Sequence, residues 1–117
     1  MCVTAAFAIL CLCIGVRLYR SYSPLDGIGG MVWGVILAED TVYAPGYTEA
    51  NFVRVSVGMS LHQVYSLVGP PLDVWTNKDS SLGMKWSKSP RDTNFRCRVL
   101  EFANGKVVDK HAEFYVD

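Results

Sequence analysis

Few residues in this sequence could do chemistry, and their spacing fits no catalytic or metal-binding pattern. Its two histidines, His62 and His111, have no partner at the spacing of a metal site or a catalytic pair, so we interpret both as surface residues. No serine stands in the Gly-x-Ser-x-Gly turn that exposes a nucleophile. The glycine-rich stretch at 27–30 lacks the lysine of a phosphate-binding loop. We therefore expect no enzymatic activity, no cofactor, no metal and no small-molecule substrate.

Cysteine content and charge argue against two further classes of protein. Only Cys97 lies outside the apolar N-terminal stretch, so neither a disulfide framework nor a zinc site is expected. We interpret Cys97 as an unpaired thiol that acts as a small apolar group in the folded domain. Lys and Arg together number 11, as do Asp and Glu. This balance argues against nucleic-acid binding, which requires a basic surface.

The N-terminal stretch is an unbroken apolar run from residue 2 to residue 16, followed by Arg17 and Arg20. As a helix this run would be about 22 Å long, against a hydrocarbon core of about 30 Å. Leu18 and Tyr19 would extend the span if Arg17 snorkelled towards the headgroups. We predict that residues 1–20 form an uncleaved transmembrane anchor and that the chain is a single-pass membrane protein.

Three other interpretations of this run fit the residues less well. A signal peptide needs basic residues before the apolar run and a small-residue cleavage site after it, and neither is present. A lipoprotein signal needs a small residue before the modified cysteine, whereas leucine precedes both Cys11 and Cys13. A core helix would be apolar along one stripe and not on every face. Under the positive-inside rule, Arg17 and Arg20 would place the rest of the chain in the cytoplasm.

Residues 57–71 give the strongest local signal, that of a short helix specified at both ends. Ser60 is a suitable N-cap, and Gln63 three residues later completes a capping box. Gly69 is suited to the residue after the helix, and two prolines then prevent its continuation. One apolar stripe, expected to dock on a sheet, consists of Leu61, Val64, Tyr65 and Val68.

The remaining stretches divide the chain into three parts. Residues 21–46 are predicted to be a linker and an extended segment, because a turn-rich stretch precedes a short apolar run at 31–38. Residues 47–117 are predicted to form the folded domain. In it, Thr48 can cap a first short helix that ends near residue 55. Strand-like stretches follow at 72–76, 83–87, 95–103 and 106–115.

The last two strand-like stretches flank Asn104-Gly105, the sequence favoured in a two-residue hairpin turn. The register that such a turn sets pairs Ala103 with Lys106, Cys97 with Ala112, and Phe95 with Phe114. We expect Phe95, Cys97 and Val99 on the core side and an exposed ion pair of Arg96 with Glu113. Phe102 and Val107 would then lie on the outer face near the turn, so a bulge around 99–101 is expected.

The segment from residue 55 to residue 72 resembles the signature of the SmpA/OmlA family, to which the BamE outer-membrane assembly lipoproteins belong. The resemblance covers about residues 47–115, and Trp86 and the 102–107 hairpin also resemble the family's later strands. Its motif residues, structural in character, are Gly58, Met59, Ser60, Gln63, Val64, Gly69 and Pro71. The resemblance implies an α+β fold, with two short helices packed on a three-stranded antiparallel sheet and preceded here by the N-terminal transmembrane helix.

The expected function is that of a membrane-tethered, non-catalytic protein-interaction domain of the outer-membrane assembly type. Its expected partners are the membrane, through residues 1–20, and other membrane or envelope proteins. The resemblance implies a periplasmic domain, in contrast to the cytoplasmic placement by charge. An alternative is an inhibitor-type binding module, because the architecture also resembles the repeats of β-lactamase inhibitor proteins. Trp75, between Pro71 and a polar loop, is a possible interface anchor, and Trp86 is expected in the core.

Overall fold

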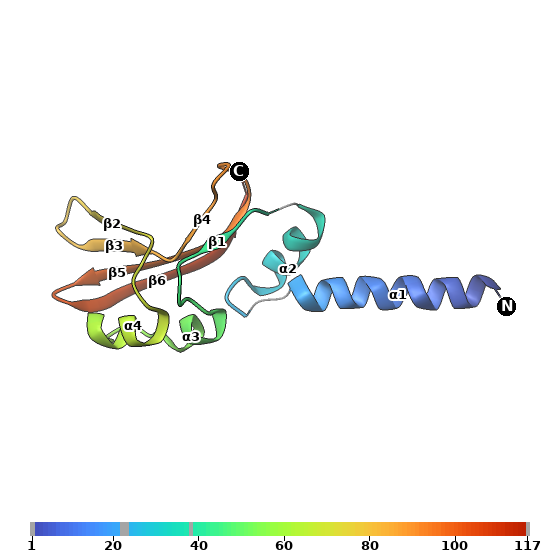
Figure 1. Cartoon of the computed structure of the whole chain (residues 1–117), viewed down its shortest axis with the longest axis horizontal. Helices are drawn as coiled ribbons and strands as arrows, with labels where there is room; N and C mark the ends of the chain where they lie inside the picture. Colours follow the sequence, from blue (N-terminus) through green and yellow to red (C-terminus); the bar gives the residue numbers. More distant parts are fainter. Residues whose placement is uncertain (1, 22–23, 38, 117) are drawn as a thin grey trace.

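An N-terminal helix projects from an α+β body in the computed structural model, which describes residues 2–21, 24–37 and 39–116 (Figure 1). The chain measures 65 × 27 × 22 Å along its principal axes. Its helices are α1 (Cys2–Ser21), α2 (Gly27–Ile36), α3 (Glu49–Arg54) and α4 (Leu61–Val68). Its strands are β1 (Val42–Tyr43), β2 (Asp73–Thr76), β3 (Leu82–Lys85), β4 (Ser87–Lys88), β5 (Phe95–Ala103) and β6 (Lys106–Tyr115).

The main sheet is antiparallel and has four strands in the order β2-β3-β5-β6, and β1 and β4 form a separate two-stranded sheet. The α+β class is as expected, but the three-stranded sheet that the resemblance implied is wrong. The difference lies at the edge, where β2 pairs with β3 from Asp73 opposite Lys85 to Thr76 opposite Leu82.

No helix among the described residues is long and apolar enough to cross a membrane. The predicted transmembrane anchor at residues 1–20, and with it the single-pass membrane location, is therefore wrong. The physical reason is the length of the apolar run, because Arg17 interrupts α1 after about 22 Å of apolar helix. Met1 lies outside the described residues.

Residues 27–36 form helix α2, where the sequence suggested a linker followed by an extended segment. A short apolar run does not distinguish a strand from a buried helix by its periodicity, so tertiary contacts decide between them. Here α2 packs against α1 and β6. Gly30 allows this approach, because a Cβ there would lie 2.2 Å from Cβ of Asp26 and 3.4 Å from Cβ of Phe114. Residue 38 lies outside the described residues.

The hairpin of β5 and β6 confirms the predicted turn and corrects the register beyond it. Asn104 and Gly105 have φ angles of 54° and 75°, as a two-residue turn requires. Ala103 pairs with Lys106, but the register shifts between Glu101 and Phe102. The extra residue is on β6 and not at 99–101. Beyond the shift the pairs include Cys97 with Glu113, Arg96 with Phe114 and Phe95 with Tyr115.

Because the extra residue is on β6, β5 alternates without a break, and its faces at the end far from the turn are the reverse of those expected. Alternate residues of β5 are buried on the core face, and these are Arg96, Arg98, Leu100 and Phe102. Phe95, Cys97 and Val99, expected in the core, face the other way. Val107 and Phe114 are an odd number of residues apart, and both are buried because the extra residue brings them to the same face. The expected exposed pair of Arg96 with Glu113 is therefore not formed.

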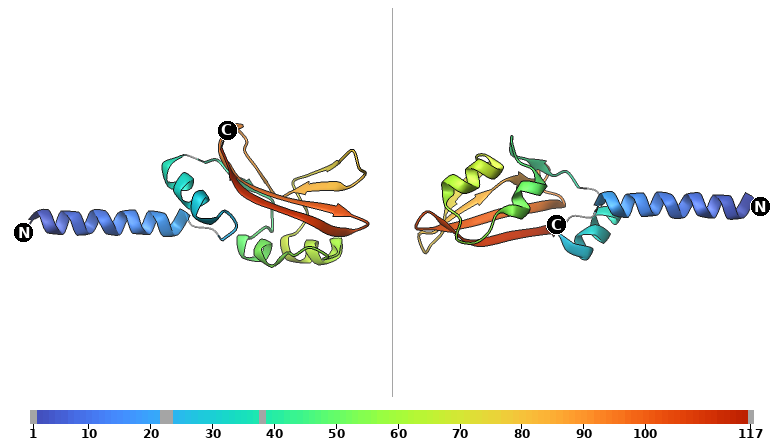
Figure 2. Two further views of the ribbon diagram at one scale, coloured as in Figure 1. Left: turned by 180° about the vertical axis from the view of Figure 1, so that it is seen from behind. Right: turned by 90° about the horizontal axis from the view of Figure 1, so that it is seen from below.

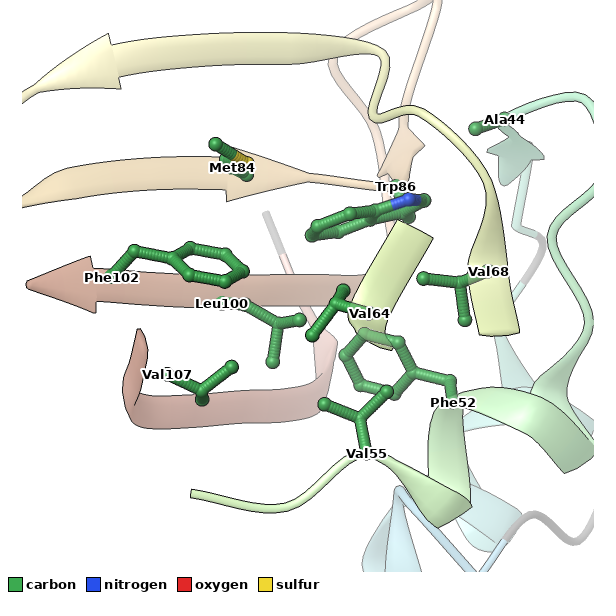
Figure 3. Close-up of a cluster of buried hydrophobic side chains, with 10 residues drawn as sticks. All are labelled: Ala44, Phe52, Val55, Val64, Val68, Met84, Trp86, Leu100, Phe102 and Val107. Carbon is green, nitrogen blue, oxygen red and sulfur yellow. The ribbon is translucent and has the colours of Figure 1, made fainter. Parts of the chain in front are cut away.

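The core lies between the sheet and the helices α3 and α4, which cover one face of hairpin β5–β6 (Figures 1 and 2). Trp86 is fully buried at its centre, as expected, and its indole N–H donates to the carbonyl oxygen of Gly69 at 3.0 Å. Phe52 of α3 packs at a centroid distance of 6.4 Å from Trp86. The cluster, drawn in Figure 3, contains Ala44, Phe52, Val55, Val64, Val68, Met84, Trp86, Leu100, Phe102 and Val107.

Candidate functional site

Two arginines of β5 are buried on the core face and bind three carboxylates. Arg98 is completely buried; its Nη1 and Nη2 each lie 2.8 Å from one oxygen of Asp26, and its Nε lies 3.0 Å from Glu49. Arg96 also pairs with Asp26, and its Nε lies 3.1 Å from Glu39. We call these five residues, Asp26, Glu39, Glu49, Arg96 and Arg98, the arginine cluster.

Ion pairing favours the charged form of both arginines in the cluster. Burial alone would lower the pKa of Arg98, but its hydrogen bonds with Asp26 and Glu49 outweigh burial and raise that pKa. The pKa of Arg96 is raised in the same way, against burial, by Glu39 and Asp26. Every carboxylate of the cluster faces a guanidinium group. Such mutual pairing supplies no nucleophile or general base, and it is suited to holding distant segments together.

A stacked pair of tyrosines borders the cluster. The rings of Tyr43 and Tyr47 are 4.7 Å apart and nearly parallel, with 9° between their planes. The hydroxyl of Tyr47 donates to Glu49 at 3.1 Å. Burial, reinforced by the negative charge of Glu49, raises the pKa of both tyrosines. Both phenols are therefore held in the protonated form, and that of Tyr47 donates to Glu49.

The cluster joins the N-terminal helices to the sheet. Asp26 is at the N-cap position of α2, but its side chain makes no capping hydrogen bond. Its carboxylate, fully buried, instead binds the two arginines of β5. The position of α2, and of α1 packed on it, is thereby fixed with respect to β5.

Helix α1 projects away from the body (Figure 2), and apolar side chains along its length are exposed. Large apolar residues at both ends and in the middle are largely exposed, with Val3 at 82%, Phe7 at 67% and Leu12 at 68%. Contiguous apolar surfaces of this kind mark interaction sites in folded proteins. The exposed apolar surface of α1 is therefore the first candidate interaction surface.

The face of the main sheet opposite α3 and α4 is the second candidate. We call it the outer face; by strand alternation and register it carries Asp73, Trp75, Gly83, Lys85, Val99, Glu101, Asp109, His111 and Glu113. Trp75, the proposed interface anchor, is 37% exposed and lies over Gly83. The structure therefore places its indole on the outer face and not in the core.

The residues of the SmpA/OmlA-like motif build and dock α4. Ser60 Oγ accepts from the backbone N–H of Gln63 at 3.2 Å, and Gln63 Oε1 accepts from that of Ser60 at 2.8 Å, so the capping box is confirmed. Val64 is fully buried, and Met59 is partly buried against the core. The N-terminal side of the helix is attached to β6, since Gly58 N–H donates to Val107 at 2.8 Å.

The C-terminal side of α4 is formed by the last two motif residues. Gly69 has a φ of 70°, and a Cβ there would lie 3.3 Å from the carbonyl oxygen of Pro45. Pro71 follows and is half-buried. All of the motif residues thus have structural roles in positioning α4.

Three further side chains that the sequence singled out are His62, His111 and Cys97. His62 is exposed on α4, and His111 is exposed with Nε2 2.9 Å from Glu113, which confirms the surface interpretation of both. Cys97 is unpaired and half-buried, and burial raises the pKa of its thiol. Among the residues that the structure describes, no group of three or more His, Cys, Asp or Glu is placed to hold a metal ion.

A shallow cavity of about 200 Å³ lies at the far end of the outer face. It is lined by Lys85, Lys88, Ser89, Asp92, Thr93, Phe95 and Tyr115. Its charged side chains are of both signs, so it has no clear preference for an anion or a cation.

Comparison with protein families, with curated proteins and with solved structures gave no match. The functional interpretation therefore depends on the surfaces described above.

The arginine cluster was not predicted from the sequence, although the sequence carries a signal for it. Phe102 and Val107 are the apolar pair next to the turn, and both are buried. Extending their face along β5 by strand alternation leads to Leu100, Arg98 and Arg96. If the core face of β5 is assigned from Phe102 beside the turn, and not from Phe95 and Cys97, both arginines are predicted to lie in the core.

Proposed function

We propose that this chain is a non-catalytic protein-interaction domain whose helix α1 binds in an apolar groove of a partner protein. The observation that carries the proposal is the exposed apolar surface of α1. Side chains such as Phe7 and Leu12 keep about two thirds of their surface exposed. Apolar burial contributes about 25 cal/mol per Å², so covering this helix is strongly favourable.

The distribution of apolar side chains on α1 favours a groove over a single partner helix. Exposed apolar residues follow one another without a polar face, since Ile9, Leu10 and Leu12 are all more than half exposed. Two helices packed side by side cover one stripe of each other. A groove or a bundle covers several sides at once, which is the mode of helix-in-groove recognition.

The arginine cluster supports the same function by presenting α1 in a defined direction. Because Asp26 is bound to Arg96 and Arg98, the α1–α2 unit is attached to the body through buried ion pairs. A preorganised binding element loses less conformational entropy when it binds.

The resemblance to the SmpA/OmlA family supports this class of function and suggests a finer one. A domain of that type would act in a protein assembly of the bacterial cell envelope, and its partner would be another component of that assembly. The resemblance depends on the segment around α4, whose residues are structural here. It does not depend on α1.

The uncovered outer face favours a second candidate function, that of an inhibitor-type module. In that function a sheet face, and not α1, would block another protein's site. Half-exposed Trp75 in this face could serve as its anchor. The two functions differ in the surface that is buried on binding.

Site-specific photo-crosslinking tests the proposed function. A photoreactive amino acid at position 12 on α1 should give a discrete protein adduct in cells, whereas the same amino acid at exposed position 62 on α4 should not. The captured protein, purified, should bind the full chain and protect the thiols of Cys11 and Cys13, which are exposed in the free chain. Leu12→Glu should abolish this binding, and His62→Glu should leave it unchanged.

Three results would contradict the proposal. Adducts at position 12 with lipid and no protein would mean that α1 does not bind a groove. Binding of the captured protein that is insensitive to Leu12→Glu would assign the contact elsewhere. An adduct formed from Trp75 and not from position 12 would favour the inhibitor-type function.

A further inference from the structure

Trp75 is held as a flat platform on the outer face. A Cβ at Gly83 would lie 2.1 Å from Cε2 and 2.4 Å from Nε1 of Trp75, so the indole lies directly on the glycine backbone. Trp75 and Gly83 are cross-strand partners. An indole beside a glycine in this position covers the bare backbone with one ring face and leaves the other towards solvent. The residue accordingly remains 37% exposed.

A relay of hydrogen bonds fixes the orientation of this indole. Its N–H donates to Asn77 Oδ1 at 3.0 Å, and Asn77 Nδ2 donates to Ser81 Oγ at 2.9 Å. Ser81 Oγ in turn donates to Asp79 at 2.6 Å. Hydrogen bonds from Ser81 lower the pKa of Asp79, which keeps the last acceptor ionised. The platform is thus preorganised, and the indole N–H is already occupied.

Two carboxylates lie to one side of the platform on the same face. Gly83 pairs with Glu101 of β5, and Glu101 pairs with Asp109 of β6, so both acids follow Trp75 across the sheet. The basic side chains of this face have acidic partners, since Lys85 lies 3.9 Å from Asp73 and His111 lies 2.9 Å from Glu113. Among the described residues Glu101 and Asp109 form no salt bridge, so the region beside the indole is negative.

We propose that this part of the outer face binds a cationic segment of a partner protein, with an arginine stacked on Trp75 and paired with Glu101. An exposed indole face attracts cations through its quadrupole, and a neighbouring carboxylate adds a charge-assisted hydrogen bond. A guanidinium group can do both at once, because it is planar and carries a fork of donors, whereas an ammonium group is a point charge. Phosphate-bearing ligands are repelled by the same carboxylates.

This contact goes beyond the proposed function, because it involves a different surface from α1. The two surfaces can be tested separately, since Trp75 and Glu101 are on the sheet and Leu12 is on the projecting helix.

Nuclear magnetic resonance of the full chain, kept dispersed in a non-ionic detergent, tests the proposal. The probe is a capped glycine-serine peptide with two arginines, compared with versions carrying lysine or neutral citrulline. The arginine peptide should shift the indole N–H signal of Trp75 and the amides of Gly83 and Glu101 in a saturable manner. The lysine peptide should bind more weakly, citrulline should not bind, and added salt should weaken the binding.

Variants identify the groups that bind. Trp75→Ala and Glu101→Gln should each weaken binding about threefold to tenfold, and Trp75→Tyr should retain part of it. Glu113→Gln is the matched control, because it removes the same charge from the same face. Glu113 lies about 13 Å along β6 from Asp109, the cross-strand partner of Glu101. Its replacement should therefore leave binding unchanged. Unshifted signals of the other amides in Glu101→Gln would show an intact sheet.

Several outcomes would overturn the proposal. These are the absence of a saturable shift, equal binding of the citrulline peptide, and equal weakening by Glu113→Gln and Glu101→Gln. Binding that requires Leu12 and not Trp75 would also overturn it, while leaving the proposed role of α1 intact.

Discussion

Arg98 is a fully buried charged residue whose guanidinium is shared between two carboxylates. Removing a guanidinium group from such a site leaves buried carboxylates that have lost a partner, which is costly even where the intact ion pair adds little net stability. The guanidinium also donates to the backbone carbonyl of Cys97 at 2.8 Å. Its role at the residue scale is therefore to satisfy several acceptors at once, among them the fully buried carboxylate of Asp26.

Arg98→Met should lower the free energy of unfolding by about 3–5 kcal/mol, because it leaves Asp26 and Glu49 without this buried cation. Urea denaturation followed by circular dichroism would measure the loss. Exposed Arg91 provides the matched control, and Arg91→Met should change stability by less than about 0.5 kcal/mol. A similar small effect at both positions would show that the arginine cluster is not a stabilising contact.

The raised pKa values of Tyr43 and Tyr47 predict that the folded chain loses stability at alkaline pH. Burial and the charge of Glu49 raise the pKa of both above the ordinary value of 10.0. Below pH 10 both folded and unfolded chains hold these protons, so their contribution to stability is complete. Above pH 10 the unfolded chain releases them first, and stability falls as pH rises further.

A pH series of urea denaturation would measure this fall, and Tyr47→Phe should make it less steep. Titration of tyrosinate absorbance in the folded chain gives an independent check. Tyr43 and Tyr47 should resist ionisation until the chain unfolds. Titration of both near pH 10 in the folded state would contradict the prediction.

At the scale of elements, α4 is the best specified part of the chain. Both hydrogen bonds of its capping box are present, and its apolar stripe meets the core at Val64 and Val68. A helix of two turns is unstable alone in water, so the cap and the docking surface must act together.

Ser60→Ala should destabilise the folded chain by about 1 kcal/mol, because the backbone N–H of Gln63 loses its acceptor. The shift in the urea midpoint would measure it. Ser66→Ala on the same helix is the control; Ser66 is exposed, and its hydroxyl only donates back to the carbonyl of His62. If both variants have the same midpoint as the parent chain, the cap does not contribute to stability.

At the scale of the whole molecule, the arginine cluster couples the N-terminal helices to the sheet. Its contacts join residues 72 positions apart in the sequence, from Asp26 to Arg98. The direction in which α1 projects from the body (Figure 1) therefore depends on a buried ion pair outside α1 itself.

Asp26→Ala should loosen this attachment while leaving the hairpin folded. Amides of α2 should exchange about tenfold faster or more, since hydrogen bonds to charged groups contribute about 1.5–3 kcal/mol. Amides near the turn at 104–105 should be unchanged in hydrogen-exchange measurements. Asp92→Ala, in an exposed loop, is the control and should alter neither region. Unchanged exchange of the α2 amides would mean that Asp26 does not hold the α1–α2 unit against the sheet.

The sequence by itself determined the elements whose causes are local. The capping box of α4 depends on residues three apart, and the turn at Asn104-Gly105 on two adjacent residues with positive φ. The α+β class follows from the order of such elements, because each is specified by its own few residues.

Only the tertiary structure decided what depended on contacts between distant residues. The inner face of β5 depended on Asp26 and Glu49, which bind Arg98 from 72 and 49 positions away. Helix α2 depended on packing against β6, since its short apolar run fits a helix and a strand equally well. Strand alternation from Phe102 places Arg98 on the inner face, but the carboxylates that make its burial possible lie so far away in the chain that no local pattern indicates them.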